Sequence, residues 1–435
     1  MAAARNLLVI MTDQLGGHVL DRTAHDHFTT PALSALAGRS LHYDRAYTSF
    51  PLCTPARSSF ATGRYPHELG VNGNDNSGGR HVGREPDSWG HHFTRAGLET
   101  LWGGKWHACH PSADHADGFA RVRDFGDHGL TDWAVEQLTT RDSDERPFVM
   151  TVSFDDPHTI CEYARSQPMP YGDVDPVPAP DRPPLPVNHA VAPYAPQCLR
   201  HEREEAAPVY ATGDWGPDDW RAYRHAYAKL VQRVDGHVGR ILDALAASPH
   251  ADDTAVVFLA DHGDGDAAHQ WSQKTALYEE SIRVPLLIMV PGTTAARIDV
   301  PVNVGIDLLP TACALVGVEP PVDLPGQDLS TGAPANDPVI VQTRFPRDRF
   351  PTVGRSIIEQ RWKYTVYSWG DDREQLVDLA ADPGEQRNLA IESRHHDTLV
   401  RLRARLAEWC VAHADDQIIG RLVTPTGRIR TARPY

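Results

Sequence analysis

Cysteine is scarce in this chain of 435 residues: six are present, and none of them forms a C-x-x-C pair. Cysteines scattered in this way indicate neither a zinc site nor a disulfide framework, which favours a reducing compartment. Long apolar runs are also missing. No stretch approaches the roughly 20 apolar residues of a membrane helix, and the run from Leu7 to Met11 is too short for a signal-peptide core. We therefore expect a cytoplasmic protein with no membrane partner.

Positive charge is in deficit, because 42 Lys and Arg stand against 58 Asp and Glu and give a formal net charge of −16. Without a basic surplus to neutralise phosphates, nucleic acid is not an expected partner, although a local basic pocket remains allowed. The 41% hydrophobic and 23% charged residues are those of an ordinary globular protein. A chain of this length exceeds one average core, so we expect one large domain and one smaller domain.

Short apolar runs alternate with helical patterns along most of the chain. Residues 6–11 (NLLVIM), 148–154 (FVMTVSF) and 255–260 (AVVFLA) predict strands that are covered on both faces. Residues 218–248 predict a long helix, because apolar side chains recur there at steps of three and four residues. This alternation predicts a doubly wound α/β fold, with helices on both faces of a mostly parallel sheet.

Two segments depart from the alternation. Eleven prolines lie between Pro168 and Pro208, so neither a helix nor a central strand is expected there. The segment of about 160–215 is then either a disordered linker or an ordered loop that arches over a site, and we expect the loop. Beyond residue 335, alternating patterns predict strands and residues 394–410 predict a helix. We therefore expect a main domain of residues 1–334 and a small antiparallel α+β domain of residues 335–435.

Acidic residues follow two of the predicted strands. Asp13 comes just after the first strand, and Asp261 follows the strand at 255–260. Ligands of parallel sheets bind beyond the carboxyl ends of the strands, so both acids would meet at one edge. A cation between them would relieve the repulsion of two close carboxylates. Oxygen ligands suit Ca²⁺ or Mg²⁺, and the adjoining His262 would also accept Mn²⁺. The alternative is that each Asp caps a following helix.

Further polar side chains follow the same strand ends. Lys105 and His107 come after an apolar stretch, His158 comes after the strand at 148–154, and Lys274 lies downstream of Asp261. Each is unremarkable alone, since lysines and histidines are usually solvated or hydrogen-bonded. Together with Arg57 they would form a crevice suited to a tetrahedral oxyanion.

At residues 53–66 the sequence CTPARSSFATGRYP resembles the C-x-P-x-R signature of the type I, formylglycine-dependent sulfatases of the alkaline phosphatase superfamily. GGKWH, SFDDPH, LADHGD and YEESIRVPLLI resemble further segments of that family, in the same order. The resemblance implies a large mixed, mostly parallel sheet sandwiched by helices, as in alkaline phosphatase, and a smaller C-terminal antiparallel α+β subdomain.

The resemblance also implies a reaction. In this family a separate formylglycine-generating enzyme oxidises the signature cysteine, here Cys53, to Cα-formylglycine. One hydroxyl of the hydrated aldehyde attacks the sulfur of a sulfate ester, and the other expels the bound sulfate when it loses its proton. The metal ligands would be Asp13, Asp261 and His262, with Ca²⁺ expected and Mn²⁺ or Mg²⁺ as alternatives.

Five more residues acquire roles from the resemblance. Arg57 would hold the hydrated aldehyde, and Lys105 and Lys274 would neutralise the oxygens of the transferring group. His107 resembles the base that helps to release sulfate, and His158 resembles the acid that protonates the leaving oxygen.

Two positions depart from the commonest sulfatase pattern. Gln14 stands where many sulfatases have a second Asp, and His262 stands where many have Asn. The Asp-Gln and Asp-His pairs resemble the choline sulfatase and phosphonate monoester hydrolase branches. Gln14 is therefore a candidate substrate contact, and Asn74 is either a substrate contact or a turn former.

We expect the substrate to be a small sulfated metabolite, because the acidic chain would repel a polysulfated polymer. The leaving group would be held by the proline-rich segment, by residues such as Trp89, Tyr163 and His189 if they line that segment, or by the C-terminal domain. A phosphonate monoester or phosphodiester hydrolase is the alternative on the same site. A sulfuryl transferase, or a non-catalytic metal-dependent binding protein with an unconverted Cys53, is also compatible with these residues.

Overall fold

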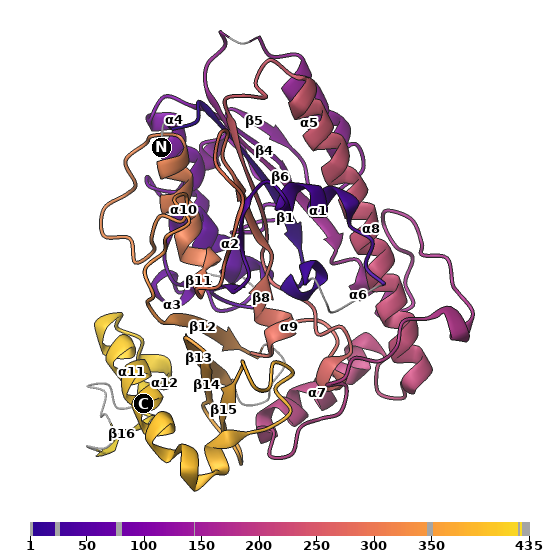
Figure 1. The fold of residues 1–435 in the computed structure, drawn as a ribbon, viewed down its shortest axis with the longest axis vertical. Helices are drawn as coiled ribbons and strands as arrows, with labels where there is room; N and C mark the ends of the chain where they lie inside the picture. Colours follow the sequence, from indigo (N-terminus) through magenta and orange to yellow (C-terminus); the bar gives the residue numbers. More distant parts are fainter. Residues whose placement is uncertain are drawn as a thin grey trace.

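An eight-stranded sheet forms the centre of the larger part of the molecule (Figure 1). The computed structural model describes residues 3–21, 27–74, 81–142, 144–345, 351–424 and 427–428. The strand order is β10-β2-β9-β7-β1-β6-β4-β5, and β9 is antiparallel to both β2 and β7, whereas the other neighbours are parallel. The expected mixed, mostly parallel sheet is therefore confirmed. Its strands are β1 (Asn6–Asp13), β2 (Leu41–Tyr43), β4 (Glu99–Gly104), β5 (Arg121–Arg123), β6 (Phe148–Pro157), β7 (Thr254–Ala260), β9 (Leu286–Met289) and β10 (Ala296–Ile298).

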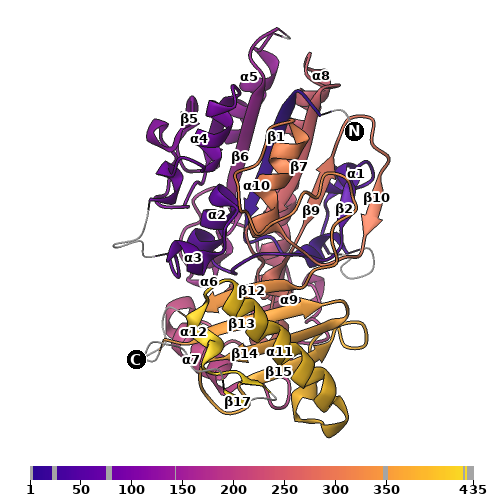
Figure 2. The same ribbon diagram turned by 90° about the vertical axis from the view of Figure 1, so that its left-hand side faces the viewer.

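Helices cover both faces of this sheet, as the alternating pattern predicts. One face carries α1 (Pro31–Ala37), α5 (Leu130–Thr139) and α8 (Pro217–Ala247), and the other carries α2 (Cys53–Thr62), α4 (Trp89–Arg95) and α10 (Val304–Leu315) (Figures 1 and 2). The prediction of a long helix at 218–248 is confirmed by α8. Its apolar stripe is buried against the sheet and comprises Tyr223, Tyr227, Leu230, Val234, Val238 and Leu242.

The central strands β1, β6 and β7 are buried along their whole length, which agrees with their nearly continuous apolar sequences. Leu7, Leu8, Val9 and Ile10 of β1 have no exposed surface. Burial of a side chain of this kind contributes roughly 1.5–3 kcal/mol. The middle of the sheet is therefore a rigid base from which the strand ends project.

Short elements complete the larger part. A three-stranded sheet consists of β3 (Ala46–Tyr47), β8 (Arg283–Val284) and β11 (Val302–Asn303). The short helices are α3 (Pro66–Leu69), α6 (Ile160–Ala164) and α9 (Glu279–Ile282).

The C-terminal part is an antiparallel sheet with a helix packed on it, as predicted. Its strands, in order, are β12 (Val339–Arg344), β13 (Val353–Glu359), β14 (Trp362–Tyr367) and β15 (Glu374–Asp378), of which β15 was not anticipated. Helix α11 (His396–Ala412) buries Leu399, Leu402 and Leu406 in one cluster with side chains of this sheet. The remaining elements are α12 (Asp416–Ile419), β16 (Val423–Thr424) and β17 (Gly427–Arg428). The domain boundary at 334/335 stays a prediction.

The proline-rich segment contains a helix, so the expectation that no helix could persist there is wrong. Helix α7 spans Gln197–Tyr210 and follows Pro196. Ten of the eleven prolines precede it, and Pro208 lies in its last turn, so the backbone hydrogen bond that Pro208 cannot donate is lost near the end of the helix. Every residue from 160 to 215 has a described position, which favours the ordered segment over the disordered linker.

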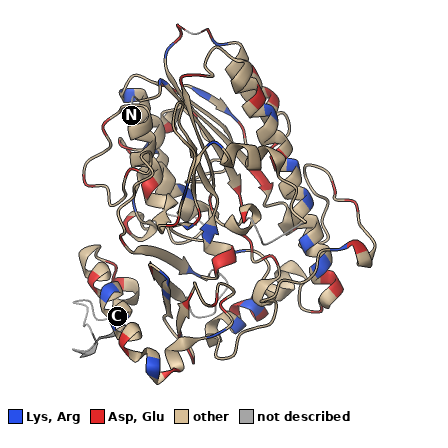
Figure 3. Cartoon of the chain, viewed as in Figure 1, with Lys and Arg blue, Asp and Glu red and all other residues tan. Residues whose placement is uncertain are grey.

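All six cysteines are free thiols, and five of them are buried. Within the described ranges, none of the helices combines the length and the apolar character that crossing a bilayer requires. Acidic and basic residues are spread over both parts of the molecule (Figure 3).

Candidate active site

Four adjacent parallel strands, in the order β7-β1-β6-β4, end at the same edge of the large sheet. Asp13 is the last residue of β1, and Asp261 follows β7 directly. Lys105 follows β4, and His158 follows β6. The topology therefore delivers four polar side chains to one place, as the positions of the strand ends predict.

Glycine allows the chain to leave β4 at this edge. Gly104 has a φ of 86°, and a Cβ there would lie 2.1 Å from the carbonyl oxygen of Ser153. An L-residue is disfavoured in that conformation and would collide with β6. Gly104 thus sets the position of Lys105, the next residue.

Helix α2 brings Cys53 and Arg57 to the same edge. Cys53 opens the helix, and Arg57 lies four residues later, which places both side chains on one face. The side-chain oxygen of Asn74 accepts a hydrogen bond from the Thr54 amide at 3.1 Å. The free amides of the first turn favour negative charge near residue 53. The C-x-P-x-R spacing is therefore the spacing of one helical turn.

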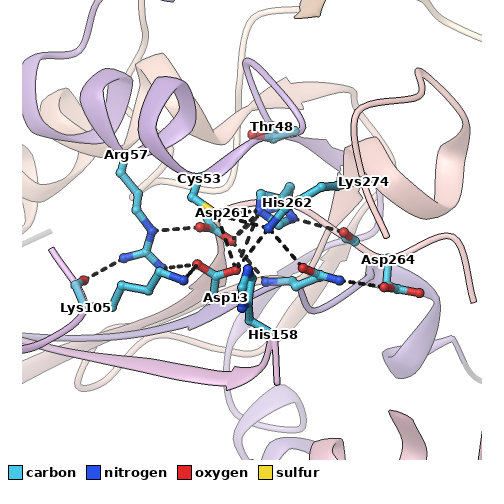
Figure 4. A network of polar contacts seen from close by, with 12 residues as sticks. Asp13, Thr48, Cys53, Arg57, Lys105, His158, Asp261, His262, Asp264 and Lys274 are labelled. Carbon is cyan, nitrogen blue, oxygen red and sulfur yellow. Dashed lines mark hydrogen bonds and ion pairs between the residues drawn. The ribbon is translucent and has the colours of Figure 1, made fainter. Parts of the chain in front are cut away.

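Four potential ligand atoms converge in this buried site. They belong to Asp13, Cys53, Asp261 and His262, and all lie within 4.8 Å of one another (Figure 4). His262 Nε2 is 3.6 Å from Asp13 Oδ1, 3.6 Å from Asp261 Oδ1 and 3.4 Å from Cys53 Sγ. The two acids thus face each other, and neither caps a helix.

The donor set fits a divalent metal ion. The Nδ1 atom of His262 lies 3.0 Å from the Gly263 carbonyl oxygen and donates its hydrogen to it, which leaves Nε2 free to bind a cation. Burial and the charge of Asp13 raise the pKa of Asp261. A cation beside both carboxylates would favour their ionised forms. Two carboxylate oxygens and one imidazole suit Ca²⁺, Mg²⁺ or Mn²⁺.

Arg57 is bound to the same two carboxylates. Its Nε lies 2.7 Å from Asp261 Oδ2, and its terminal nitrogens donate to Asp13, Ser153 Oγ and the Lys105 carbonyl oxygen. Four of the five donor hydrogens of a guanidinium are used in this way. The structure thus places Arg57 behind the ligand atoms, where it fixes their orientation. The predicted contact between Arg57 and a hydrated aldehyde stays a prediction.

Two lysines add positive charge around residue 53. Lys105 Nζ lies 2.8 Å from Asp13 Oδ2 and 2.8 Å from Asp155 Oδ1. Lys274 Nζ lies 3.1 Å from Cys53 Sγ. Burial and Asp13 raise the pKa of the Cys53 thiol, but Lys274 and Lys105 outweigh them and hold that pKa well below its ordinary value. The site therefore stabilises an anion at position 53.

Asp13 is held in its ionised form. Burial would raise the pKa of its carboxyl, but the nearby cations Lys105, His158, Lys274 and Arg57 outweigh burial and hold the pKa well below its usual value. Burial lowers the pKa of Lys274, whereas Cys53 and Asp13 raise it to a net value above its ordinary one. Asp13 and Lys274 are thus both charged at neutral pH.

A cavity of about 990 Å³ opens above these groups. Lys105, His107, His158 and Lys274 line it, which brings the four expected transfer residues to one space. His107 has a φ of 51° and is half-buried, and its Nδ1 has no hydrogen-bond partner among the described residues. His107 is therefore available to a ligand, whereas the ring nitrogens of His158 lie 3.9 Å from Asp155 Oδ1 and 3.9 Å from Cys161 Sγ.

The two candidate substrate contacts differ. Asn74 lines the cavity. Gln14 is fully buried and lies outside the cavity wall: its amide nitrogen donates to Asp264 at 2.7 Å, and its oxygen accepts from Lys274 at 3.0 Å. Gln14 therefore holds Lys274 and is not placed against the cavity.

The expectation about the leaving group is partly wrong. Trp89 packs in the core behind Arg57, Tyr163 faces a different pocket, and His189 packs edge to face against Trp220. None of these three lines the cavity, whereas α7 of the proline-rich segment does. Sequence reasoning had no signal for α7, because the prolines before it dominate the composition.

Three contacts in the site were not predicted from the sequence. Asp155 binds Lys105, Ser153 binds Arg57, and Asp264 binds Gln14. Ser153 and Asp155 belong to SFDDPH, and Asp264 belongs to LADHGD. These residues could have been predicted, because they lie near strand ends in segments that resemble parts of the sulfatase family.

The sequence of this chain is similar to those of known sulfatases. The family model described as Sulfatase matches residues 5–318, and the model described as N-sulphoglucosamine sulphohydrolase, C-terminal, matches residues 267–412. The Delta 4,5-hexuronate-2-O-sulfatase of Bacteroides thetaiotaomicron is 27% identical over 441 residues, which cover 94% of this chain and 90% of the relative. The choline-sulfatase of Rhizobium meliloti is 29% identical over 460 residues, which cover 93% and 86%.

Solved structures of a sulfatase and of a phosphonate monoester hydrolase have the same fold as this chain. A 2-O GAG sulfatase superposes with a TM-score of 0.81 at 25% identity, covering 95% of this chain and 93% of that one. The phosphonate monoester hydrolase of Agrobacterium radiobacter superposes with a TM-score of 0.70 at 21% identity, covering 99% of this chain and 100% of that one. The latter shows the fold alone.

Proposed function

This chain belongs to the sulfatase family and is a sulfuric ester hydrolase, and we propose that it cleaves the sulfate ester of a small metabolite with a formylglycine made from Cys53. One observation carries the proposal: Cys53 opens a buried helix beside two acids, a histidine and Lys274. That arrangement stabilises an anionic oxygen at position 53 and a transferring sulfuryl group next to it.

Asp13, Asp261 and His262 would hold a divalent metal, for which we propose Ca²⁺. When bound, such an ion lowers the pKa of a nearby hydroxyl and neutralises the charge of a sulfate oxygen. Formylglycine would supply, as its hydrate, one hydroxyl for attack on sulfur and a second one for the release of sulfate. Arg57 orients the two carboxylates throughout the reaction, because four of its donor hydrogens are already bound.

The cavity residues act on the substrate. Lys105 and Lys274 are proposed to bind the sulfuryl oxygens, with Asp155 and Gln14 holding the two ammonium groups in place. His158 is proposed to protonate the leaving oxygen, and His107 to accept the proton whose loss releases sulfate. Asn74 is proposed to contact the substrate, since it lines the cavity and is fixed to the first turn of α2.

A phosphonate monoester or phosphodiester hydrolase is the second candidate. Gln14 and His262 favour it, and so does the fold shared with a phosphonate monoester hydrolase. The sulfate ester remains the first choice because the two relatives described above, which match along most of the chain, are named as sulfatases. Cytoplasmic location, maturation by a formylglycine-generating enzyme, and water as the sulfuryl acceptor stay predictions from the sequence.

Two measurements test the proposal. Intact-mass analysis of protein from a host with the maturation enzyme should show the aldehyde at residue 53, and an unmodified thiol would favour a binding protein. Initial rates with sulfate, phosphate and phosphonate monoesters and diesters should then show sulfate monoesters as the fastest substrates. Cys53→Ala should abolish turnover. Cys410→Ala is the control and should retain turnover, because Cys410 lies in α11 of the C-terminal part and not in the site. A faster phosphonate ester would favour the second candidate.

A further inference from the structure

The wall of the active-site cavity has the opposite charge balance to the whole chain. The chain has 42 basic against 58 acidic residues. The described wall carries five basic side chains and one carboxylate: Lys105, Arg165, Arg203, Lys274, Arg344 and Glu202. Lys105 and Lys274 are accounted for by their contacts with Asp13 and Cys53. Arg165, Arg203 and Arg344 contact none of the catalytic groups, and we call them the arginine trio.

The trio comes from parts of the chain that deliver no catalytic group. Arg165 directly follows α6, and Arg203 lies on α7, both within the proline-rich segment. Arg344 ends β12 in the C-terminal sheet. The proline-rich segment and the C-terminal sheet thus each add positive charge to a cavity whose floor is built by the large sheet.

Contacts within the protein orient two of these side chains. The Arg165 guanidinium lies 4.8 Å from the centre of the Tyr210 ring, and its NH1 is 3.7 Å from Glu162 Oε1. Arg203 is half-buried, and its NH1 donates a hydrogen bond of 3.3 Å to the His269 carbonyl oxygen. Stacking holds the Arg165 guanidinium and one hydrogen bond holds that of Arg203, so most donor hydrogens of both groups stay available.

Two members of the trio, Arg203 and Arg344, have charges that no carboxylate of the described residues balances, whereas Arg165 lies 3.7 Å from Glu162. Arg344 is exposed, whereas Arg203 is half-buried and its hydrogen bond goes to a backbone carbonyl oxygen, not to a carboxylate. The buried arginines elsewhere differ: Arg57, Arg224 and Arg355 each bind at least one buried Asp. Burial lowers the pKa of Arg203, against the opposing effects of Tyr278 and Glu204. A half-buried cation without such a partner is stabilised when an anion binds.

We propose that the arginine trio is an anion subsite, and that the substrate carries a second anionic group, a carboxylate or another sulfate, on the alcohol released from the scissile ester. The inference rests on the proposed sulfatase function. The cavity has room for it, because about 990 Å³ is near the upper end of ligand pockets and far exceeds one sulfate group. A cationic alcohol such as choline would be repelled by three arginines.

A matched pair of substrates tests the subsite. Methyl glycosides of glucuronate and of glucose, each sulfated in turn at positions 2, 3 and 4, differ only in the carboxylate. The aldehyde-bearing enzyme should cleave the acidic member with a kcat/KM at least ten-fold higher, and this preference should shrink as salt rises. A glucose disulfate distinguishes a second sulfate from a carboxylate as the preferred anion, and choline sulfate is the cationic member of the panel.

Single substitutions assign the preference to the trio. In Arg203→Gln, Arg344→Gln and Arg165→Gln, the ratio of kcat/KM for the acidic over the neutral substrate should fall several-fold. Arg240→Gln is the control, because Arg240 is exposed and pairs with Asp132 on another face. Affinities of the acidic and neutral sugars for the Cys53→Ala protein, measured by calorimetry, give the same comparison without turnover.

The possible results distinguish a failure of the anion subsite from a failure of the proposed sulfatase function. Equal rates and affinities for both sugars, or a preference for choline sulfate, would refute the anion subsite while leaving the sulfatase function intact. Failure of the aldehyde-bearing protein to cleave any sulfate ester would instead overturn the proposed function, and with it this inference. A preference for the acidic sugar that all three Arg→Gln variants retain would show that other residues cause it.

Discussion

Replacing Arg57 by Gln tests the electrostatic organisation of the site most directly. Arg57 is 2% exposed and bridges Asp13 and Asp261, which have no exposed surface. Removing one partner of a buried ion pair costs about 3–5 kcal/mol, because the other charge stays buried without compensation. We therefore expect Arg57→Gln to lose about 3–5 kcal/mol of unfolding free energy when a chelator keeps divalent ions away.

Added Ca²⁺ should restore part of this loss. An ion that binds only the folded state contributes about 2.7 kcal/mol at 100 times its Kd. The gain should be larger for Arg57→Gln than for the unmodified chain, since a neighbouring positive charge has been removed. Urea unfolding with chelator and with Ca²⁺ measures both effects, and Arg240→Gln, an exposed pair, should lose less than about 1 kcal/mol. A loss below about 1 kcal/mol for Arg57→Gln in chelator, or equal gains from Ca²⁺, would refute the reasoning.

Three further predictions concern the metal ligands and the C-terminal part. Asp261→Asn should lower both the divalent metal bound per chain, measured by elemental analysis, and the rate of sulfate release; an unaltered metal content would contradict the ligand assignment. Lys363→Met should lower the unfolding free energy by about 3 kcal/mol or more, because Lys363 is buried between Glu279 and Glu385 at 3.0 and 2.9 Å, whereas the exposed Lys229→Met should have little effect. Burial raises the pKa of Asp415, but Arg355 outweighs it and lowers the net pKa, so this pair stabilises the fold above about pH 4 and is lost as pH falls through the folded-state pKa. Asp415→Asn should therefore flatten the acid limb of a stability profile measured by urea unfolding, and an unchanged limb would show that the pair is not its cause.

Most of the site residues could be predicted because they follow the ends of recognisable strands. Asp13, Asp261, Lys105 and His158 come from separate parts of the chain, yet each follows a buried strand, and parallel strands end together. Apolar runs and strand ends are local features, so one sequence is enough to recognise them. The spacing of Cys53 and Arg57 is also local, since it spans one helical turn.

Tertiary contacts could not be predicted in the same way. Whether Gln14 faces the cavity or Lys274 depends on a positive φ of 70° at that residue and on the position of Asp264. Arg203 was missed because α7 follows ten prolines and no pattern shows which wall a helix of a long insertion will form. Within the described part of the chain the strand β15 pairs with β14 alone, and it has five residues, so its sequence signal is weak.

Helix α2 is buried along all ten of its residues, and Cys53 is 1% exposed. An enzyme that oxidises this thiol has to grip the surrounding peptide and reach its Cβ, which a close-packed helix does not permit. If Cys53 is converted as proposed, its oxidation has to come before residues 53–62 dock onto the sheet, so that oxidation and folding compete for one segment of a newly made chain. Under that proposal, a chain that folded first would keep its thiol and remain inactive.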